Sequence, residues 1–227
     1  MSEPSRTTVL KLGGSLLDLP DLFERLDRVI RSMQPLQVLI VVGGGAAADV
    51  IRDLDAQSTL TPSQANWAAI DAMSYNARLL CRLDRRLAFV RDRSQAEAAW
   101  NSCRVPILDA CSFLKDGRLP GAADAVPELP ESWDVTSDSI AAWVALNWPA
   151  SDLLFVKSCN LTVADATSAA AAGLVDQHLP QLLLCASAPL RIGWIDLTAD
   201  DLRIEHFTAS NVGGRETRWT ERLRTAR

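Results

Sequence analysis

The stretch VLIVVGGGAAADVIR, residues 38–52, places an apolar run, three glycines and a helix-like segment in direct succession. The run VLIVV is apolar throughout rather than alternating, which is typical of a strand covered on both faces. The segment after the glycines has the 3.6-residue spacing of a helix, and glycines allow a tight turn between the two. A strand that leads into a helix in this way is the repeating unit of a parallel α/β sheet.

The same alternation continues along the rest of the chain. Continuous apolar runs predict strands at 8–12, 37–42, 87–90, 105–108, 152–156 and 191–197. Helical spacing predicts helices at 21–33, 46–56, 62–80 and 138–148. We therefore predict a three-layer α/β/α sandwich with a mostly parallel central sheet, in which ligands bind at the carboxyl ends of the strands. Residues 1–227 are expected to form one domain, with 116–132, rich in Pro, Gly and acidic residues, as a surface excursion.

The composition limits the classes of function. A formal net charge of -5 argues against a surface that binds nucleic acid or an anionic membrane, since both need a concentrated positive field. The five cysteines, at 81, 103, 111, 159 and 185, form no close pair and suggest neither a disulfide framework nor a zinc site. No apolar run approaches about 18 residues, and the opening MSEPSRTT has no apolar stretch after a basic start. We expect a soluble cytoplasmic protein.

The first loop whose residues can bind a ligand follows the strand at 8–12, in the stretch KLGGS. Lys11 is one of only three lysines in the chain and stands in an apolar strand. Gly13 and Gly14 let backbone N–H groups approach an anion closely, beside the Lys11 ammonium and Ser15. A Gly-Gly turn after a strand is also common with no function, so this stretch alone decides little.

The second loop holds Gly43, Gly44 and Gly45 before a helix, whose N-terminus can bind a negative group. Two glycine turns at two strand ends indicate one phosphate approached from two sides. Gly43, Gly45 and Ala48 also fit the dinucleotide fingerprint GxGxxG/A. That alternative expects an acidic residue about 20 positions later, and TLTPSQANWAA (59–69) contains none.

The third loop lies in WDVTSDSIAAWVA, residues 133–145. Thr136, Ser137 or Asp138 can begin a helix there, because their side chains accept hydrogen bonds from free N–H groups. Asp138 can instead face the same crevice as the two glycine loops. Both interpretations stay open on the residues alone.

Taken in order, four stretches resemble the motifs of the amino acid kinase superfamily, which includes acetylglutamate, aspartate, uridylate and isopentenyl phosphate kinases. They are KLGGSLL (11–17), VVGGG (41–45), TSDSIAA (136–142) and LLFVKS (153–158), and the resemblance covers most of residues 7–197. The sequences of GGGAAADVIR, NWAAIDAM (66–73) and WDVTSDSIAAW look closest to those of the small kinases of methanofuran and tetrahydromethanopterin biosynthesis. One archaeal member of that branch phosphorylates an aminomethylfuran phosphate to a diphosphate.

The resemblance implies roles for particular residues. Lys11 would stabilise the phosphoryl group in transfer, and Asp138 would orient that lysine and keep it charged. The glycines at 13, 14, 43 and 44 would supply N–H donors to the transferring phosphate and the acceptor. Lys157 would place a second positive charge on ATP, with Ser158 beside it. The acceptor side would occupy about residues 1–130 and the nucleotide side about 131–227.

The chain departs from the family pattern at two places. Relatives usually carry Val-Asp-Gly after the strand at 152–156, whereas Lys157 and Ser158 lead into Cys159 here. In the closest branch a histidine commonly precedes the tryptophan that begins the acceptor-side helix, and Asn66 stands there in this chain.

The acceptor site is open to two interpretations. The spacing of three residues places them near one face of a helix: Trp67, Asp71 and Arg78. From that face, the acidic and the basic side chain can bind an amine and a phosphate. Alternatively, Trp67 packs in the core and the two charges face water. Arg52 is likewise either a phosphate ligand or part of the polar side of its helix.

We therefore expect an ATP-dependent phosphotransferase for a small metabolite bearing a phosphate or carboxylate. The alternative is a noncatalytic ligand-binding or storage protein of the same fold. His178 and His206 stand without metal-ligand neighbours, so no protein metal site is expected, and Mg²⁺ would arrive with ATP. Many relatives form dimers or hexamers, so we also expect a homo-oligomer.

Overall fold

The computed structural model describes residues 6–116, 126–148, 150–186, 190–209 and 220–222. Within them, eight strands form one sheet in the order β3-β4-β2-β1-β5-β6-β7-β8. The strands are β1 (Thr7–Leu12), β2 (Gln37–Val42), β3 (Leu87–Val90), β4 (Val105–Leu108), β5 (Asp152–Lys157), β6 (Arg191–Asp196), β7 (Arg203–Phe207) and β8 (Thr220–Arg222). The surface excursion predicted at 116–132 falls in part on 117–125, outside the described residues, as do residues 1–5 of the opening segment.

The six neighbouring strands β3, β4, β2, β1, β5 and β6 pair in parallel. Strand β7 pairs antiparallel with both β6 and β8. All six strands predicted from the apolar runs are present, within one residue at each end. The antiparallel edge was not predicted, because RIEHF in β7 is too polar to read as a buried strand.

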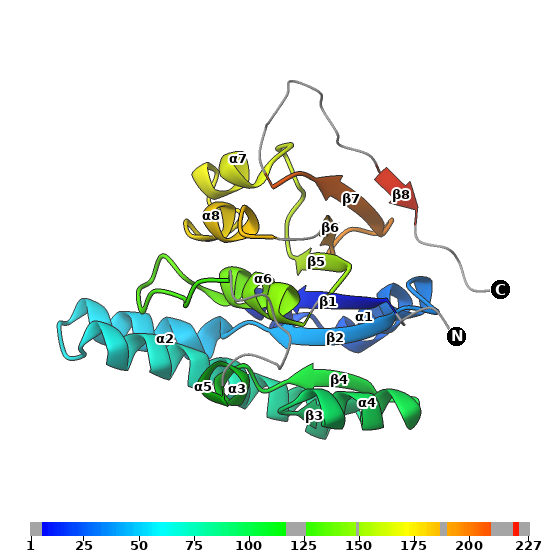
Figure 1. Cartoon of the computed structure of the whole chain (residues 1–227), viewed down its shortest axis with the longest axis horizontal. Coiled ribbons are helices and arrows are strands. Elements are labelled where there is room, and N and C mark those ends of the chain that lie inside the picture. The colour runs from blue at the N-terminus through cyan, green and yellow to red at the C-terminus, as the bar shows by residue number, and fades with distance from the viewer. Residues whose placement is uncertain (1–5, 117–125, 149, 187–189, 210–219, 223–227) are drawn as a thin grey trace.

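The helices alternate with the strands and cover both faces of the sheet (Figure 1). They are α1 (Leu22–Ser32), α2 (Gly45–Ala56), α3 (Pro62–Leu83), α4 (Arg93–Asn101), α5 (Ala110–Asp116), α6 (Ser137–Asn147), α7 (Ala166–Ala171) and α8 (Leu179–Leu183), with a short 3-10 turn η1 (Gly14–Asp18). Each of the four predicted helices is present. The predicted three-layer α/β/α fold with a mostly parallel sheet is confirmed.

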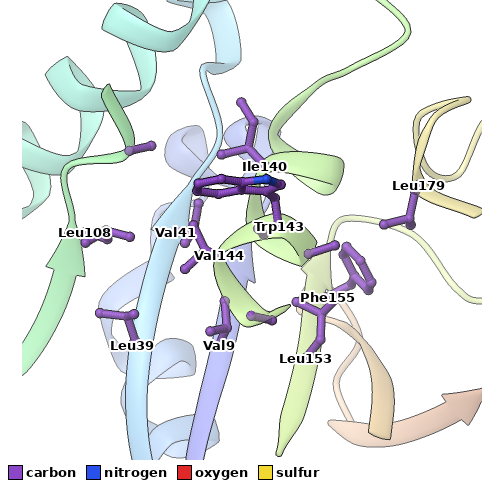
Figure 2. Packing of buried hydrophobic residues seen from close by; sticks show 14 of the residues in the cluster. Val9, Leu39, Val41, Leu108, Ile140, Trp143, Val144, Leu153, Phe155 and Leu179 are labelled. Atoms are coloured by element: carbon purple, nitrogen blue, oxygen red, sulfur yellow. The ribbon is translucent and has the colours of Figure 1, made fainter. Parts of the chain in front are cut away.

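Alternation of side chains along β1 separates two cores. Val9 packs on the face covered by α6, whereas Leu10 and Leu12 pack on the face covered by α1. Helix α6 is apolar on nearly every side and buried, as expected for a helix enclosed in the core. Figure 2 shows its Trp143 and Val144 facing Val9 and Val41 of the central strands.

The N-terminus of α3 is closed by a capping box between Thr61 and Gln64, which satisfies two N–H donors that the helix leaves free. Within the described part of the chain, no helix combines the length and apolar character that crossing a bilayer requires.

Candidate active site

The carboxyl ends of β1, β2 and β5 meet at one edge of the sheet, because these three strands are neighbours and parallel. Lys11 points to the same face as Val9, two residues earlier, and Lys157 to the same face as Phe155. That face is covered by α6, whose first turn contains Asp138. The topology therefore brings two lysines and one carboxylate together from three separate elements.

Asp138 forms ion pairs with both lysines. Its Oδ1 lies 2.8 Å from Lys11 Nζ, and its Oδ2 lies 2.7 Å from Lys157 Nζ. Lys157 also donates to the carbonyl of Leu174 at 3.0 Å. The side chains of Lys11, Asp138 and Lys157 are only 5, 6 and 13 % exposed. Two positive charges thus share one negative charge in a site with little water.

Burial and charge oppose each other in this cluster. Burial and, to a smaller extent, the charge of Lys157 lower the pKa of Lys11 to about 8, against the attraction of Asp138. Burial alone would raise the pKa of Asp138, but the charges of Lys11 and Lys157 outweigh it and hold that pKa at about 2. Asp138 is therefore ionised at neutral pH, and Lys11 titrates close to the physiological range.

Asp176 fixes the start of α6, although no local pattern in the sequence marks it as a site residue. Its buried carboxylate accepts from the N–H of Thr136 at 2.8 Å and from the N–H of Ser139 at 2.9 Å. It also accepts from the Ser139 hydroxyl at 2.5 Å. Because these contacts hold the helix N-terminus on both sides of Asp138, that carboxylate meets the lysines in a fixed orientation.

The two glycine loops pack directly against each other. A Cβ at Gly14 would lie 2.2 Å from the backbone nitrogen of Gly45, and one at Gly45 would lie 2.7 Å from the carbonyl oxygen of Gly14. Gly45 also has φ +52°, a conformation that L side chains rarely adopt. No side chain fits between these loops, so their backbone N–H groups can reach the same ligand.

Asn76 holds the second glycine loop from behind. Its Nδ2 donates to the carbonyls of Gly43 and Gly44, at 2.9 and 2.8 Å. The residue is buried in the middle of α3, where helical periodicity marks it only as part of the inner face. With these carbonyls turned to Asn76, the free N–H groups in the first turn of α2 point away from it.

A cavity of about 290 Å³ opens where these elements meet. Among the residues predicted for the site, eight line it: Lys11, Gly14, Ser15, Gly44, Gly45, Arg52, Asp138 and Lys157. Gly13 and Gly43 lie behind the lining, where their N–H groups donate to the carbonyls of Val156 and Leu12. Ser158 also lies outside it and hydrogen-bonds to Ser15 through the two hydroxyls, 3.0 Å apart.

Arg52 and Trp133 form one side of the cavity. The guanidinium carbon of Arg52 stands 4.7 Å from the ring centre of Trp133, and Arg52 pairs with Asp49 at 2.6 Å. The indole N–H of Trp133 donates to Asp55 Oδ2 at 2.6 Å, which ties the segment before α6 to α2. Trp133 begins the stretch WDVTSDSIAAWVA but was not predicted as a site residue.

The three predicted acceptor residues on α3 do not converge on this cavity. Trp67 lines a neighbouring cavity of about 190 Å³ and donates to Glu131 at 2.8 Å. Asp71 accepts from the Cys111 thiol at 3.1 Å, and Arg78 lies 3.9 Å from Asp109. Asp71 and Arg78 are exposed, as the second interpretation of this face expects.

The model of the amino acid kinase family matches residues 6–160. Among curated proteins, none matches the sequence significantly.

Three solved structures are similar to this chain. UMP kinase from Ureaplasma parvum has 16 % identity and a TM-score of 0.56, over 87 % of this chain and 92 % of its own. Aspartate kinase from Synechocystis has 13 % identity and a TM-score of 0.58, over 85 % of this chain and 38 % of its own. Uridylate kinase from Archaeoglobus fulgidus has 24 % identity and a TM-score of 0.46, over 67 % of this chain and 64 % of its own. The match therefore spans less than two thirds of the last two proteins.

Proposed function

This protein belongs to the amino acid kinase family, and we propose that it is an ATP-dependent kinase whose acceptor is a small metabolite bearing a phosphate or a carboxylate. The observation that carries the proposal is the buried cluster of Lys11, Asp138 and Lys157 beside the two glycine loops. Two cations that share one anion leave an excess of positive charge away from water. An anionic substrate in the cavity would balance that excess.

In the proposed reaction, an acceptor oxygen forms a bond to the γ-phosphorus of ATP while the bond to the bridging oxygen breaks, and ADP leaves. Lys11 donates hydrogen bonds to the oxygens of the phosphoryl group during its transfer, and Asp138 keeps Lys11 protonated and in position. Lys157 neutralises charge on the donor phosphates. The N–H groups of Gly14, Gly44 and Gly45 supply hydrogen bonds that need no reorganisation during transfer.

The cavity suits a phosphate donor accompanied by Mg²⁺. Its lining offers two ammonium groups and the N-terminus of α2, which are the groups that bind phosphate oxygens in proteins. Within the described residues, no three His, Cys, Asp or Glu side chains gather as a metal site. We therefore propose that Mg²⁺ is held by ATP oxygens, where it would offset the negative charge of the phosphates.

The acceptor would lie toward α2 and α3, where Arg52 offers a positive charge on one side of the cavity. A compound of the aminomethylfuran phosphate type is the specific candidate, and it rests on the sequence resemblance alone. A cytoplasmic location and a homo-oligomeric state also stay predictions.

The first experiment measures ADP release by the purified protein with ATP, Mg²⁺ and a panel of phosphate and carboxylate acceptors. The three lysines supply a matched pair of variants: Lys11→Ala, in the cluster, and Lys115→Ala, exposed on α5. Loss of one donor to the transition state typically costs on the order of 100- to 1000-fold in rate. We expect such a loss for Lys11→Ala and none for Lys115→Ala; equal rates in the two variants would refute the proposed role of Lys11.

A second candidate function is a noncatalytic ligand binder of the same fold. The observation in its favour is the sequence after residues 152–156, where Lys157 and Ser158 lead into Cys159 and the usual Val-Asp-Gly is missing. Thermal unfolding with ATP and ADP at millimolar concentrations separates the two candidates, because a ligand that binds only the native state raises its stability. A shift together with turnover supports the kinase, whereas no shift with any nucleotide favours the binder.

A further inference from the structure

A second cavity, of about 270 Å³, lies at the amino ends of β1, β5 and β6, at the other end of the strands from Lys11. Its apolar wall comes from the end of α1, the loop that follows, and the sheet: Met33, Pro35, Leu36, Leu154 and Ile204. Its polar side chains come mainly from the sheet. None of the residues in the proposed kinase site lines it.

The polar side chains form a row across three neighbouring strands. Thr8 of β1 is in register with Asp152 of β5, and Asp152 is in register with Arg191 of β6. All three lie on the face of the sheet that α1 covers, since they alternate with residues of the α6 face. His206 of β7 also lines the cavity; it is in register with Gly193, two residues beyond Arg191 on β6.

The Thr8 hydroxyl is the most informative member of this row. Thr8 is 0 % exposed, and within the described residues its Oγ1 has no hydrogen-bond partner. A buried hydroxyl left without a partner costs about 1–3 kcal/mol, so such groups usually mark a missing partner. Because Thr8 lines the cavity, a ligand in that cavity is the natural partner.

The charged pair beside Thr8 indicates the chemistry of that ligand. Arg191 Nε lies 2.5 Å from Asp152 Oδ1, and Asp152 Oδ2 accepts from the Ser151 hydroxyl at 2.6 Å. Both carboxylate oxygens are therefore engaged, whereas a guanidinium has five N–H donors and keeps some for a further partner. The row offers donors from Arg191 and Thr8 next to an apolar wall.

We propose that this cavity is a second binding site, which takes a small monocarboxylate with an apolar body. The carboxylate would accept hydrogen bonds from Arg191 and Thr8, and the body would pack on Met33, Pro35 and Leu36. A carboxylate is favoured over a phosphate because Asp152 already balances the charge of Arg191, which leaves little positive charge for a dianion. The volume lies just below the roughly 300 Å³ at which sites for drug-sized ligands begin, so the ligand is small.

The test uses the full chain and calorimetric titration, with thermal unfolding as a second readout. The probes are benzoate and 4-methylpentanoate, their primary amides, and inorganic phosphate. We expect the two carboxylates to bind and to raise Tm, the amides to bind at least tenfold more weakly, and phosphate not to compete with benzoate. Absence of carboxylate binding, or equal binding of the amides, would overturn the proposal.

Three variants locate the binding. Arg191→Gln should weaken benzoate binding at least tenfold, since a hydrogen bond to a charged group contributes about 1.5–3 kcal/mol and tenfold corresponds to about 1.4 kcal/mol. Arg203→Gln is the matched control, because Arg203 is also half-exposed on a strand and paired with an aspartate, Asp201, but lies outside the cavity. Lys11→Ala should bind benzoate as well as the wild type does; a loss there would mean that the probe binds in the kinase site and would refute the proposal.

Thr8→Val adds a readout that a purely structural threonine would not give. Replacing an unpartnered hydroxyl by a methyl of similar size should raise the Tm of the ligand-free protein while weakening benzoate binding. Lower stability without any change in affinity would contradict the assignment of Thr8. Because none of these measurements uses ATP, their outcome is independent of the proposed kinase activity.

Discussion

The two ends of β1 and β5 carry charged clusters of different character. At the carboxyl ends, Lys11 and Lys157 share Asp138, and all three side chains are almost completely buried. At the amino ends, Arg191 pairs one-to-one with Asp152, and Arg191 is 48 % exposed. Keeping unbalanced charge away from water is costly, so the excess positive charge marks the end of the sheet that suits a substrate with several negative charges, such as the phosphates of a nucleotide.

The largest expected effect comes from neutralising the central carboxylate of each cluster. Asp138→Asn leaves two buried ammonium groups without a counter-charge and should lower the free energy of unfolding by about 3–5 kcal/mol. Asp152→Asn should cost about 1 kcal/mol or less, because Arg191 can turn to water. Urea unfolding of the two variants measures the difference. Equal losses in the free energy of unfolding would mean that the different burial of the two clusters does not affect their stability.

The glycine contact gives the next effect. Gly14→Ala forces a Cβ against the backbone of Gly45, so we expect a loss of about 3 kcal/mol in stability and loss of nucleotide-induced stabilisation. Gly173→Ala is the control, since Gly173 has φ +70° but open space around its Cα; the backbone strain alone should cost about 1–2 kcal/mol. Calorimetric unfolding with and without ATP compares the two. If Gly173→Ala weakened ATP binding as much as Gly14→Ala does, close packing of the two glycine loops would not explain the loss of ATP binding.

The pKa of Lys11 predicts opposite trends for activity and stability. Since that pKa is about 8 in the folded chain and 10.5 unfolded, the unfolded chain binds more protons between those values, and the Lys11 contribution to stability rises with pH there. Over the same window Lys11 loses its charge, so the phosphoryl-transfer rate should fall about tenfold per pH unit above pH 8. Lys11→Arg, whose side chain stays charged, should lack both trends. The transfer rate and the free energy of unfolding of both proteins, measured from pH 7 to 10, test this prediction. If the rate of Lys11→Arg fell above pH 8 as it does in the wild type, a group other than Lys11 would be responsible for the fall.

The smallest effect is expected at Ser158. Its hydroxyl bonds to Ser15 in an exposed position and does not line the kinase cavity. Ser158→Ala should therefore change stability by about 1 kcal/mol or less and the KM for ATP by less than tenfold. A larger rise in KM, measured by steady-state ADP release, would give Ser158 a direct part in donor binding.

Much of the fold could be predicted because its signals are local. Continuous apolar runs gave the six parallel strands, and the glycine-to-helix transitions gave the edge where the cavity lies. The polar strand β7 escaped prediction because a strand near the end of a sheet, outside its core, can pair without a continuous apolar run.

The candidate site was predictable only in part, for the same reason. Lys11 stands out locally because a lysine is unusual in an apolar strand, and the glycines stand out because they directly follow β1 and β2. Asn76 and Asp176 do not, since a buried amide within a helix and an aspartate between helices have no distinctive neighbours in sequence. Their roles arise from partners more than 30 residues away.

The sequence by itself determined the six parallel strands, the glycine turns and the identity of the charged residues. Only the tertiary structure decided that Lys11 and Lys157 share one carboxylate, because that depends on β1 lying between β2 and β5 and on α6 crossing the same face. Tertiary structure likewise decided that Thr8 and Arg191, from distant parts of the chain, line one cavity. Side-chain alternation is a property of each strand, whereas the order of strands in the sheet results from packing of the whole chain.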